Sequence, residues 1–212
     1  MIDALIVQQA SRGIWQRQLD VTAELHDRYA ADHQMDLLRA VRQCARWNRW
    51  ELLVWALAHY AYVFWIDSDA AIVGSEDLRV VVQEQPIGMV WGQDLRGSEP
   101  AACNNGVMYL RSTPAAQAWA AEILAHEPAA ETNFSGPWWS ETGKTYYDAW
   151  ITLALADDPR WRNLYGRLPA RWNSIAGVSE VPEPVVMAWH GYYDQDERLR
   201  EMLAAQARGW RW

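Results

Sequence analysis

Two aspartates at the end of an apolar run are the residues of this sequence best suited to chemistry. Asp67 and Asp69 flank Ser68 and directly follow the apolar and aromatic run 62–66. Carboxylates are the hard oxygen ligands that Mg²⁺ and Mn²⁺ prefer, and such an ion could bridge two phosphates. Because residues 70–73 continue apolar, both charges would lie inside or beside a core and need a cation as partner. A solvated turn is the alternative.

Three later residues also have a chemical rationale. Asn105 and Gly106 open the apolar segment NNGVMYL. Glycine lets backbone approach a ligand closely, and an amide side chain both donates to and accepts from hydroxyl groups. The alternative is a plain turn at the end of a strand. His190 supplies an imidazole, but it is one of five histidines, and from the residue alone a structural hydrogen-bonding role is favoured.

Segments with the patterns of strands and of helices alternate along the chain, and the elements they form must position these residues. The run 62–66 is typical of a central strand covered on both faces, and open α/β sheets place ligands at the carboxyl ends of such strands. We predict an α/β fold with a central, mainly parallel sheet flanked by helices. The expected strands are 4–9, 35–41, 62–66, 87–93, 104–110 and 185–189, and the expected helices are 14–32, 45–60, 114–124 with Thr113 as its N-cap, 146–156 and 197–205. Residues 127–144 are expected to form a long surface loop.

Composition and charge limit the class of protein. The chain has 212 residues, of which 50% are hydrophobic and 22% charged, as expected for one globular domain. A net charge of -8 disfavours nucleic acid as a partner. No apolar run reaches the roughly 18 to 20 residues that cross a bilayer, and the N-terminus lacks the features of a secretion signal, so we expect a cytoplasmic protein. Four arginines cluster in sequence, and we interpret them as a solvated loop: Arg160, Arg162, Arg167 and Arg171.

Four segments together resemble one family. FWIDSDAAIV resembles the metal-binding strand end of GT-A glycosyltransferases, in particular the retaining galactosyl-, xylosyl- and mannosyltransferases and the glycogenin-like enzymes. CNNGVMYLRST resembles their N-x-G strand along the donor sugar, with Asn104, Asn105 and Gly106 as the motif. AWHGYY resembles their late His-Gly element, and ARWNRWELL resembles the helix before the strand that ends in the D-x-D motif, which here is Asp67-Ser68-Asp69. The resemblance covers nearly the whole chain, from Ala4 to Tyr193.

This resemblance implies one GT-A domain, the Rossmann-like fold of the nucleotide-diphospho-sugar transferases. Residues from about 1–75 would form a nucleotide-binding half that ends in the D-x-D motif. Residues from about 85–193 would form the half that holds the donor sugar and the acceptor, and 194–212 would be a C-terminal helix and tail.

The resemblance also assigns roles to residues. Asp69 and His190 would ligate Mn²⁺ or Mg²⁺ directly, and Asp67 would contribute to metal or ribose binding. An acidic residue would lie near the reacting sugar; Asp148 and Glu141 are competing candidates, and the family usually has Gln where this chain has Ala149. The residues expected to contact the nucleotide-sugar donor are Arg49, Asp67, Ser68, Asn105, Gly106, Trp172, Asn173 and Gly191, with Asn105 also placed among the catalytic residues and a packing role open for Trp172 and Asn173.

The resemblance therefore implies a metal-dependent hexosyl- or pentosyltransferase. The donor would be a nucleoside-diphosphate sugar, expected to be UDP-linked, and transfer to an acceptor hydroxyl would retain anomeric configuration. The acceptor could be a glycan, a protein, a lipid-linked sugar or a modified nucleobase. A metal-dependent phosphohydrolase is an alternative, but the haloacid-dehalogenase type carries its nucleophilic aspartate on the first strand. A non-catalytic nucleotide-sugar-binding protein is the other. We expect Asp69→Ala to abolish transfer and leave the fold intact.

Overall fold

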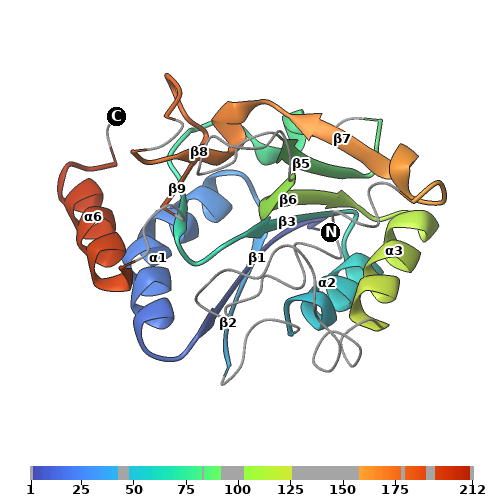
Figure 1. The fold of residues 1–212 in the computed structure, drawn as a ribbon, viewed down its shortest axis with the longest axis horizontal. Helices are drawn as coiled ribbons and strands as arrows, with labels where there is room; N and C mark the ends of the chain where they lie inside the picture. Colours follow the sequence, from blue (N-terminus) through green and yellow to red (C-terminus); the bar gives the residue numbers. More distant parts are fainter. Residues whose placement is uncertain are drawn as a thin grey trace.

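The computed structural model has an α/β architecture with one large and one small sheet (Figure 1). It describes residues 2–42, 48–82, 84–91, 103–125, 158–177, 180–189 and 194–210. The strands are β1 (Ala4–Ser11), β2 (Asp36–Arg42), β3 (Tyr62–Ile66), β4 (Ala70–Ile72), β5 (Ile87–Trp91), β6 (Cys103–Arg111), β7 (Tyr165–Leu168), β8 (Ser174–Ile175) and β9 (Val186–Ala188). The α-helices are α1 (Ile14–Asp32), α2 (Asn48–His59), α3 (Pro114–Ala125) and α6 (Gln195–Ala207), and the 3₁₀-helices are η1 (Leu78–Val81), η2 (Arg162–Leu164) and η3 (Ala170–Asn173).

The large sheet has six strands in the order β2-β1-β3-β6-β5-β7. β1 pairs in parallel with β2 and β3, and β5 pairs in parallel with β7. β6 runs antiparallel to both of its neighbours, β3 and β5. The prediction of a mainly parallel sheet flanked by helices is confirmed. It did not include the antiparallel strand β6. Because β6 is reversed, its first residues lie at the edge where β3 ends.

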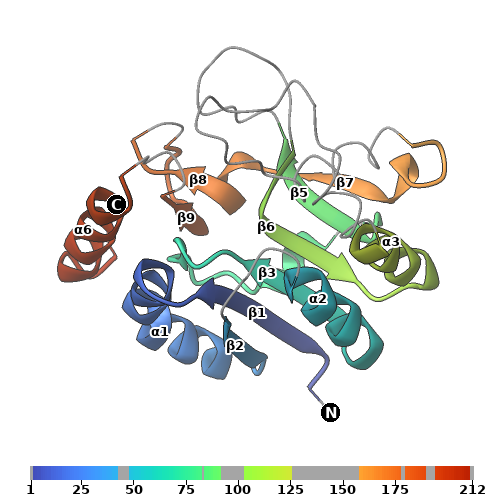
Figure 2. The ribbon, with the colours of Figure 1, turned by 60° about the horizontal axis from the view of Figure 1, so that its bottom comes forward.

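The side chains of β3 alternate between two cores, as the apolar run predicted. Val63 and Trp65 pack in a cluster with α2 and α3, which lie side by side on one face of the sheet (Figure 2). Phe64 and Ile66 face the opposite cluster, to which α1, β4 and β9 contribute. With both faces covered, β3 is buried inside the domain, and its end fixes where the following turn begins.

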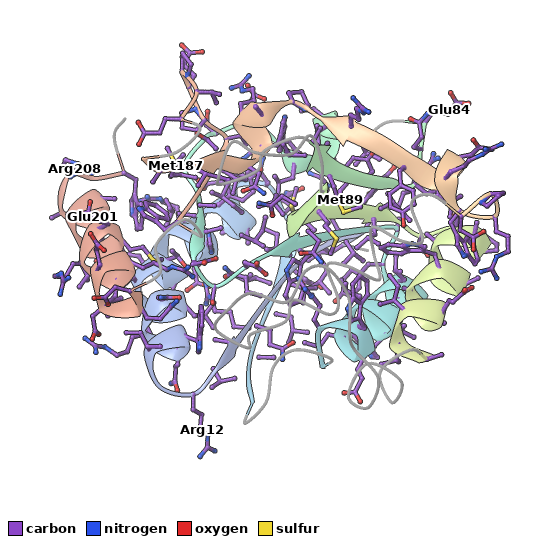
Figure 3. The ribbon with its side chains drawn as sticks, viewed as in Figure 1. Arg12, Glu84, Met89, Met187, Glu201 and Arg208 are labelled. Carbon is purple, nitrogen blue, oxygen red and sulfur yellow. The ribbon has the colours of Figure 1, made fainter. Side chains whose placement is uncertain are left out.

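A third cluster joins the small sheet to the helices α1 and α6. The small sheet has the order β4-β9-β8, and Met187 of β9 lies buried against Leu199 and Met202 of α6. Figure 1 shows α1 and α6 side by side at one end of the molecule, and Figure 3 shows Met187 on that side and Met89 within the large sheet. The C-terminal helix is therefore part of the folded core at the end of β3. No helix that the structure describes is long and apolar enough to span a bilayer.

Several expectations about the elements need correction. The strand expected at 185–189 is β9, but it pairs with β4 and β8 in a small sheet, which the prediction of one central sheet did not include. The arginine-rich stretch was interpreted as a loop, yet it contains β7 as an edge strand of the large sheet. Arg160 is paired with Asp158 and Glu122, and Arg171 with Glu76, so part of this cluster is neutralised. The expected loop 127–144 and helix 146–156 lie outside the described residues.

His26 is a fully buried histidine that ties α1 to both sheets. The Ile72 backbone N–H donates to Nε2 (2.9 Å), so Nδ1 carries the proton that it donates to Oε1 of Gln8 (2.8 Å). Burial, with a smaller effect from Arg39, lowers the pKa of His26 from 6.5 to about 3. When the pH falls below 6.5, the imidazole of His26 takes up a second proton in the unfolded chain but stays neutral in the folded protein. The folded state therefore loses stability as the pH falls from about 6.5 to about 3.

We expect the free energy of unfolding to fall by about 2 kcal/mol more between pH 7 and pH 5 in the native protein than in a His26→Gln variant. The glutamine variant lacks this linkage, so the difference isolates His26 from other titrating groups. Urea unfolding of both proteins at both pH values measures it. Equal losses in the two proteins would show that His26 does not stay neutral when folded.

Candidate functional site

The D-x-D turn lies at the carboxyl end of β3 and next to the start of β6. The Asp67 backbone N–H donates to the carbonyl of Gly106 (2.8 Å), which continues the β3–β6 ladder by one pair beyond Ile66 and Val107. The N–H of Ala70 donates to the Asp67 carbonyl (3.1 Å) and closes the turn. Two motifs that are far apart in sequence are thereby brought into one site.

Arg49 lies beside the Asp67 carboxylate. Its Nη1 is 3.6 Å from Oδ1 of Asp67 and donates to the backbone carbonyl of Asn105 (3.3 Å). The same Asp67 oxygen accepts from the indole Nε1 of Trp65 (2.7 Å), and the guanidinium carbon lies 5.1 Å from the centre of that ring. Burial lowers the pKa of Arg49, and Asp67 opposes that shift. The Arg49 side chain is 10% exposed and that of Asp67 33%, so a positive charge is held under a partly accessible carboxylate.

Asp69 is held differently, by the C-terminal helix. Its Oδ2 forms an ion pair with Nη1 of Arg198 in α6, and both side chains are almost fully buried, at 7% and 6% exposure. The Arg198 guanidinium also lies 5.5 Å from the ring centre of Trp15, near the start of α1. The backbone carbonyl of Asp69 accepts from the N–H of Trp189 (2.9 Å). The second aspartate of the motif therefore faces an arginine that sequence reasoning did not identify.

Two asparagines predicted as donor contacts are buried with unsatisfied amide atoms. Asn173 is fully buried in η3, and within the described part of the chain neither its Oδ1 nor its Nδ2 has a hydrogen-bond partner. The same is true of Nδ2 of Asn105. η3 packs against β6, so these amides come from neighbouring elements. Buried polar atoms are rarely left unsatisfied, and such atoms at a candidate site are suited to a polar ligand.

The remaining predicted residues fall into three groups. Ser68 is buried in the D-x-D turn, and the N–H of Gly106 donates to Oδ1 of Asn104 (2.9 Å). Trp172 packs in the cluster that contains Ile66, which is the packing role left open by the sequence. The others lie outside the described residues: Glu141, Asp148, His190 and Gly191.

The position of β9 bears on the expected metal ligand at residue 190. β9 runs antiparallel to β4, with Ala188 opposite Ala70. Trp189, the residue that follows the strand, is hydrogen-bonded to the Asp69 backbone. The described chain therefore stops beside the D-x-D turn, one residue before His190. Its role as a ligand stays a prediction.

The carboxylate oxygens of the D-x-D turn are suitable ligands for a divalent cation. Asp67 and Asp69 offer carboxylate oxygens within one turn, which suits Mg²⁺ or Mn²⁺. Among the residues that the structure describes, no group of three or more histidine, cysteine or acidic side chains gathers at one point. The two carboxylates are matched by the two guanidinium groups of Arg49 and Arg198.

Sequence reasoning missed two side chains that shape this site, Arg198 and Trp65. Trp65 lies two residues before Asp67, and side chains two residues apart in a strand lie on the same face. The sequence could therefore have predicted that Trp65 is a neighbour of the Asp67 carboxylate, as the hydrogen bond between them shows. Arg198 is 129 residues from Asp69 in sequence, and nothing in its local pattern distinguishes it from Arg200 on the same helix. Only the docking of α6 identifies it.

Comparisons with known proteins support the fold. No family model and no curated protein matches the sequence. A glycosyltransferase involved in glycosylation of the major capsid of PBCV-1 superposes with a TM-score of 0.71 at 14% identity, over 95% of this chain and 98% of that one. The galactosyltransferase LgtC, in complex with donor and acceptor sugar analogs, gives 0.59 at 12% identity, over 97% and 99%. GlyE of Streptococcus pneumoniae TIGR4 gives 0.56 at 12% identity, over 97% of this chain and 64% of that one. The chain has the GT-A fold.

Proposed function

We propose that this chain is a glycosyltransferase that moves a sugar from a nucleoside diphosphate to an acceptor hydroxyl, and that the nucleoside diphosphate is UDP. One observation carries the proposal: the D-x-D turn and the N-x-G strand meet at the end of β3, through the hydrogen bond from Asp67 to Gly106. The fold shared with solved glycosyltransferases supports it. The division into a nucleotide-binding half and a donor and acceptor half is part of the same proposal.

The reaction requires stabilisation of the negative charge that builds up on the departing diphosphate. A divalent ion held by Asp67 and Asp69, with His190 as a further ligand, would supply a Lewis acid for that charge. Arg49 is placed to add a second positive centre, and its planar guanidinium suits phosphate oxygens. The stacking of Arg49 on Trp65 and its bond to the Asn105 carbonyl fix its direction before the donor binds.

The donor sugar would lie along the start of β6. The unsatisfied amide atoms of Asn105 and Asn173 provide donors and an acceptor for hydroxyl groups. Asp148 or Glu141 would stabilise the positive charge that develops on the sugar ring, which is oxocarbenium-like in the transition state. Retention of anomeric configuration is the expected outcome.

The phosphohydrolase alternative finds no support in the strand order. In the haloacid-dehalogenase type of phosphohydrolase the nucleophilic aspartate lies on the first strand, whereas β1 has the sequence ALIVQQAS and contains no carboxylate. The D-x-D motif follows β3, the third strand in sequence and the neighbour of β1 in the sheet. We therefore retain transfer of a sugar as the function to test.

A donor screen tests the proposal directly. We expect the protein with Mn²⁺ to release UDP or GDP from one nucleotide sugar, and we expect EDTA to stop the release. Hydrolysis to the free sugar is sufficient as a readout, because water can replace an unidentified acceptor. Release of phosphate from p-nitrophenyl phosphate, with no donor cleaved, would instead favour the phosphohydrolase. Tight binding of a donor without cleavage would favour the non-catalytic alternative.

A further inference from the structure

We infer that Arg198 is a built-in counter-cation for the D-x-D motif, which holds Asp69 when no divalent ion is bound and competes with the ion for that carboxylate. The inference deepens the proposed function and rests on it, because it concerns the same site. The ion pair between Arg198 and Asp69 joins the last helix to the turn after β3. Loading of the ion would then require the guanidinium to give up its contact.

The position of Arg198 is fixed by the packing of α6. Asp194 caps the helix by accepting from the N–H groups of Asp196 and Glu197 (2.8 and 3.2 Å). Gln18 of α1 donates to Gln195 at the start of α6 (3.2 Å). The helix also buries Leu199 and Met202 in the cluster shared with Val21 and Met187. These contacts hold α6, and with it the backbone of Arg198, beside the D-x-D turn independently of the ion pair.

Electrostatics makes the pair a competitor. A divalent ion on the Asp69 carboxylate would lie within a few ångströms of the guanidinium, in a region where both side chains are nearly excluded from water. Like charges repel strongly at such distances when solvent does not screen them. Asp67 does not face this competition to the same degree, because its side chain is one-third exposed and Arg49 lies 3.6 Å away. Arg198 therefore sets how weakly the free protein binds an ion.

The experiment measures Mn²⁺ binding to the full chain by isothermal titration calorimetry, without donor or acceptor. We expect Arg198→Met to bind Mn²⁺ more tightly than the native protein, by about tenfold or more. Arg200→Met is the matched control, because Arg200 is on the same helix and exposed to solvent. The double variant Asp69→Asn/Arg198→Met should lose the gain, which would assign it to the Asp69 carboxylate.

Thermal unfolding covers the case in which Arg198→Met folds poorly. Without metal, this variant leaves the buried Asp69 carboxylate without its guanidinium and should melt below the native protein. Added Mn²⁺ should raise its melting temperature more than it raises that of the native protein or of Arg200→Met. A purely structural ion pair predicts the lower melting temperature but no additional response to Mn²⁺.

The outcomes separate this inference from the proposed function. Equal or weaker Mn²⁺ binding by Arg198→Met, together with donor cleavage by the native protein, overturns the inference and leaves the function standing. Donor cleavage that persists in EDTA, with no Mn²⁺ bound by either protein, also overturns it. Tighter binding by Arg198→Met supports it, even if no nucleotide sugar is cleaved, in which case the proposed function fails alone.

Discussion

Replacing Asp69 with asparagine should lower donor cleavage at least about a hundred-fold and also lower the melting temperature by on the order of 10 °C. The first effect follows from the proposed function, in which the Asp69 carboxylate holds a cation at the leaving diphosphate. The second follows from the ion pair with Arg198, because removing one partner of a buried pair costs about 3 to 5 kcal/mol. Cleavage assays and thermal unfolding measure the two effects separately.

This expectation revises the one made from sequence, in which Asp69→Ala left the fold intact. Asp3→Asn is the matched control, because Asp3 pairs with Arg79 at the surface (3.0 Å) and such pairs contribute about 1 kcal/mol or less. The double variant Asp69→Asn/Arg198→Met should regain stability and remain inactive, since both charges have been removed together. Full activity of Asp69→Asn would refute the assignment of the site.

Replacing Arg49 with methionine should lower donor cleavage by about a hundred-fold at saturating metal. Arg49 is the buried positive charge between Asp67 and the backbone of Asn105, and methionine fills a similar volume without charge. The cleavage rate of Arg49→Lys should lie between those of the native protein and Arg49→Met, because lysine keeps the charge but lacks the planar guanidinium that stacks on Trp65. Steady-state rates with the donor found in the screen, fitted for kcat and KM, give the comparison.

Arg160→Met provides the control for Arg49. Arg160 also lies over a tryptophan ring, that of Trp161, and pairs with two carboxylates. However, Arg160 precedes β7, which runs in the same direction as β3. It therefore lies where these strands begin, away from the end of β3, and its side chain is mostly exposed. We expect unchanged cleavage and little change in stability. If Arg160→Met and Arg49→Met reduced cleavage equally, the effect could not be assigned to the site.

Elements with a strong local pattern were predicted closely. β3 has the predicted bounds, α1 has the predicted bounds, and α3 begins after Thr113, whose hydroxyl accepts from the N–H of Ala116 (3.2 Å) as an N-cap. Each of these depends on side chains within a few residues of one another. β4, β7 and β8 were missed because they have two to four residues, too few for a periodic pattern.

The candidate site divides in the same way. The sequence placed Asp67 at the end of a buried strand because the apolar run stops there, and the structure confirms that position. The resemblance also singled out Asn105 and Asn173, which the structure shows to be buried with unsatisfied amide atoms. The expected contributions of Glu141, Asp148, Gly191 and His190 stay predictions.

The sequence by itself determined which segments form the central strands, where the apolar run stops, and that two carboxylates follow it, because these features depend on neighbouring residues. The tertiary structure decided that β6 runs antiparallel between β3 and β5, which brings Gly106 to Asp67. It also decided that α6 carries Arg198 to Asp69. Both contacts join segments far apart in the chain, and their free energy comes from burial and charge pairing that exist only once the sheets and helices have packed.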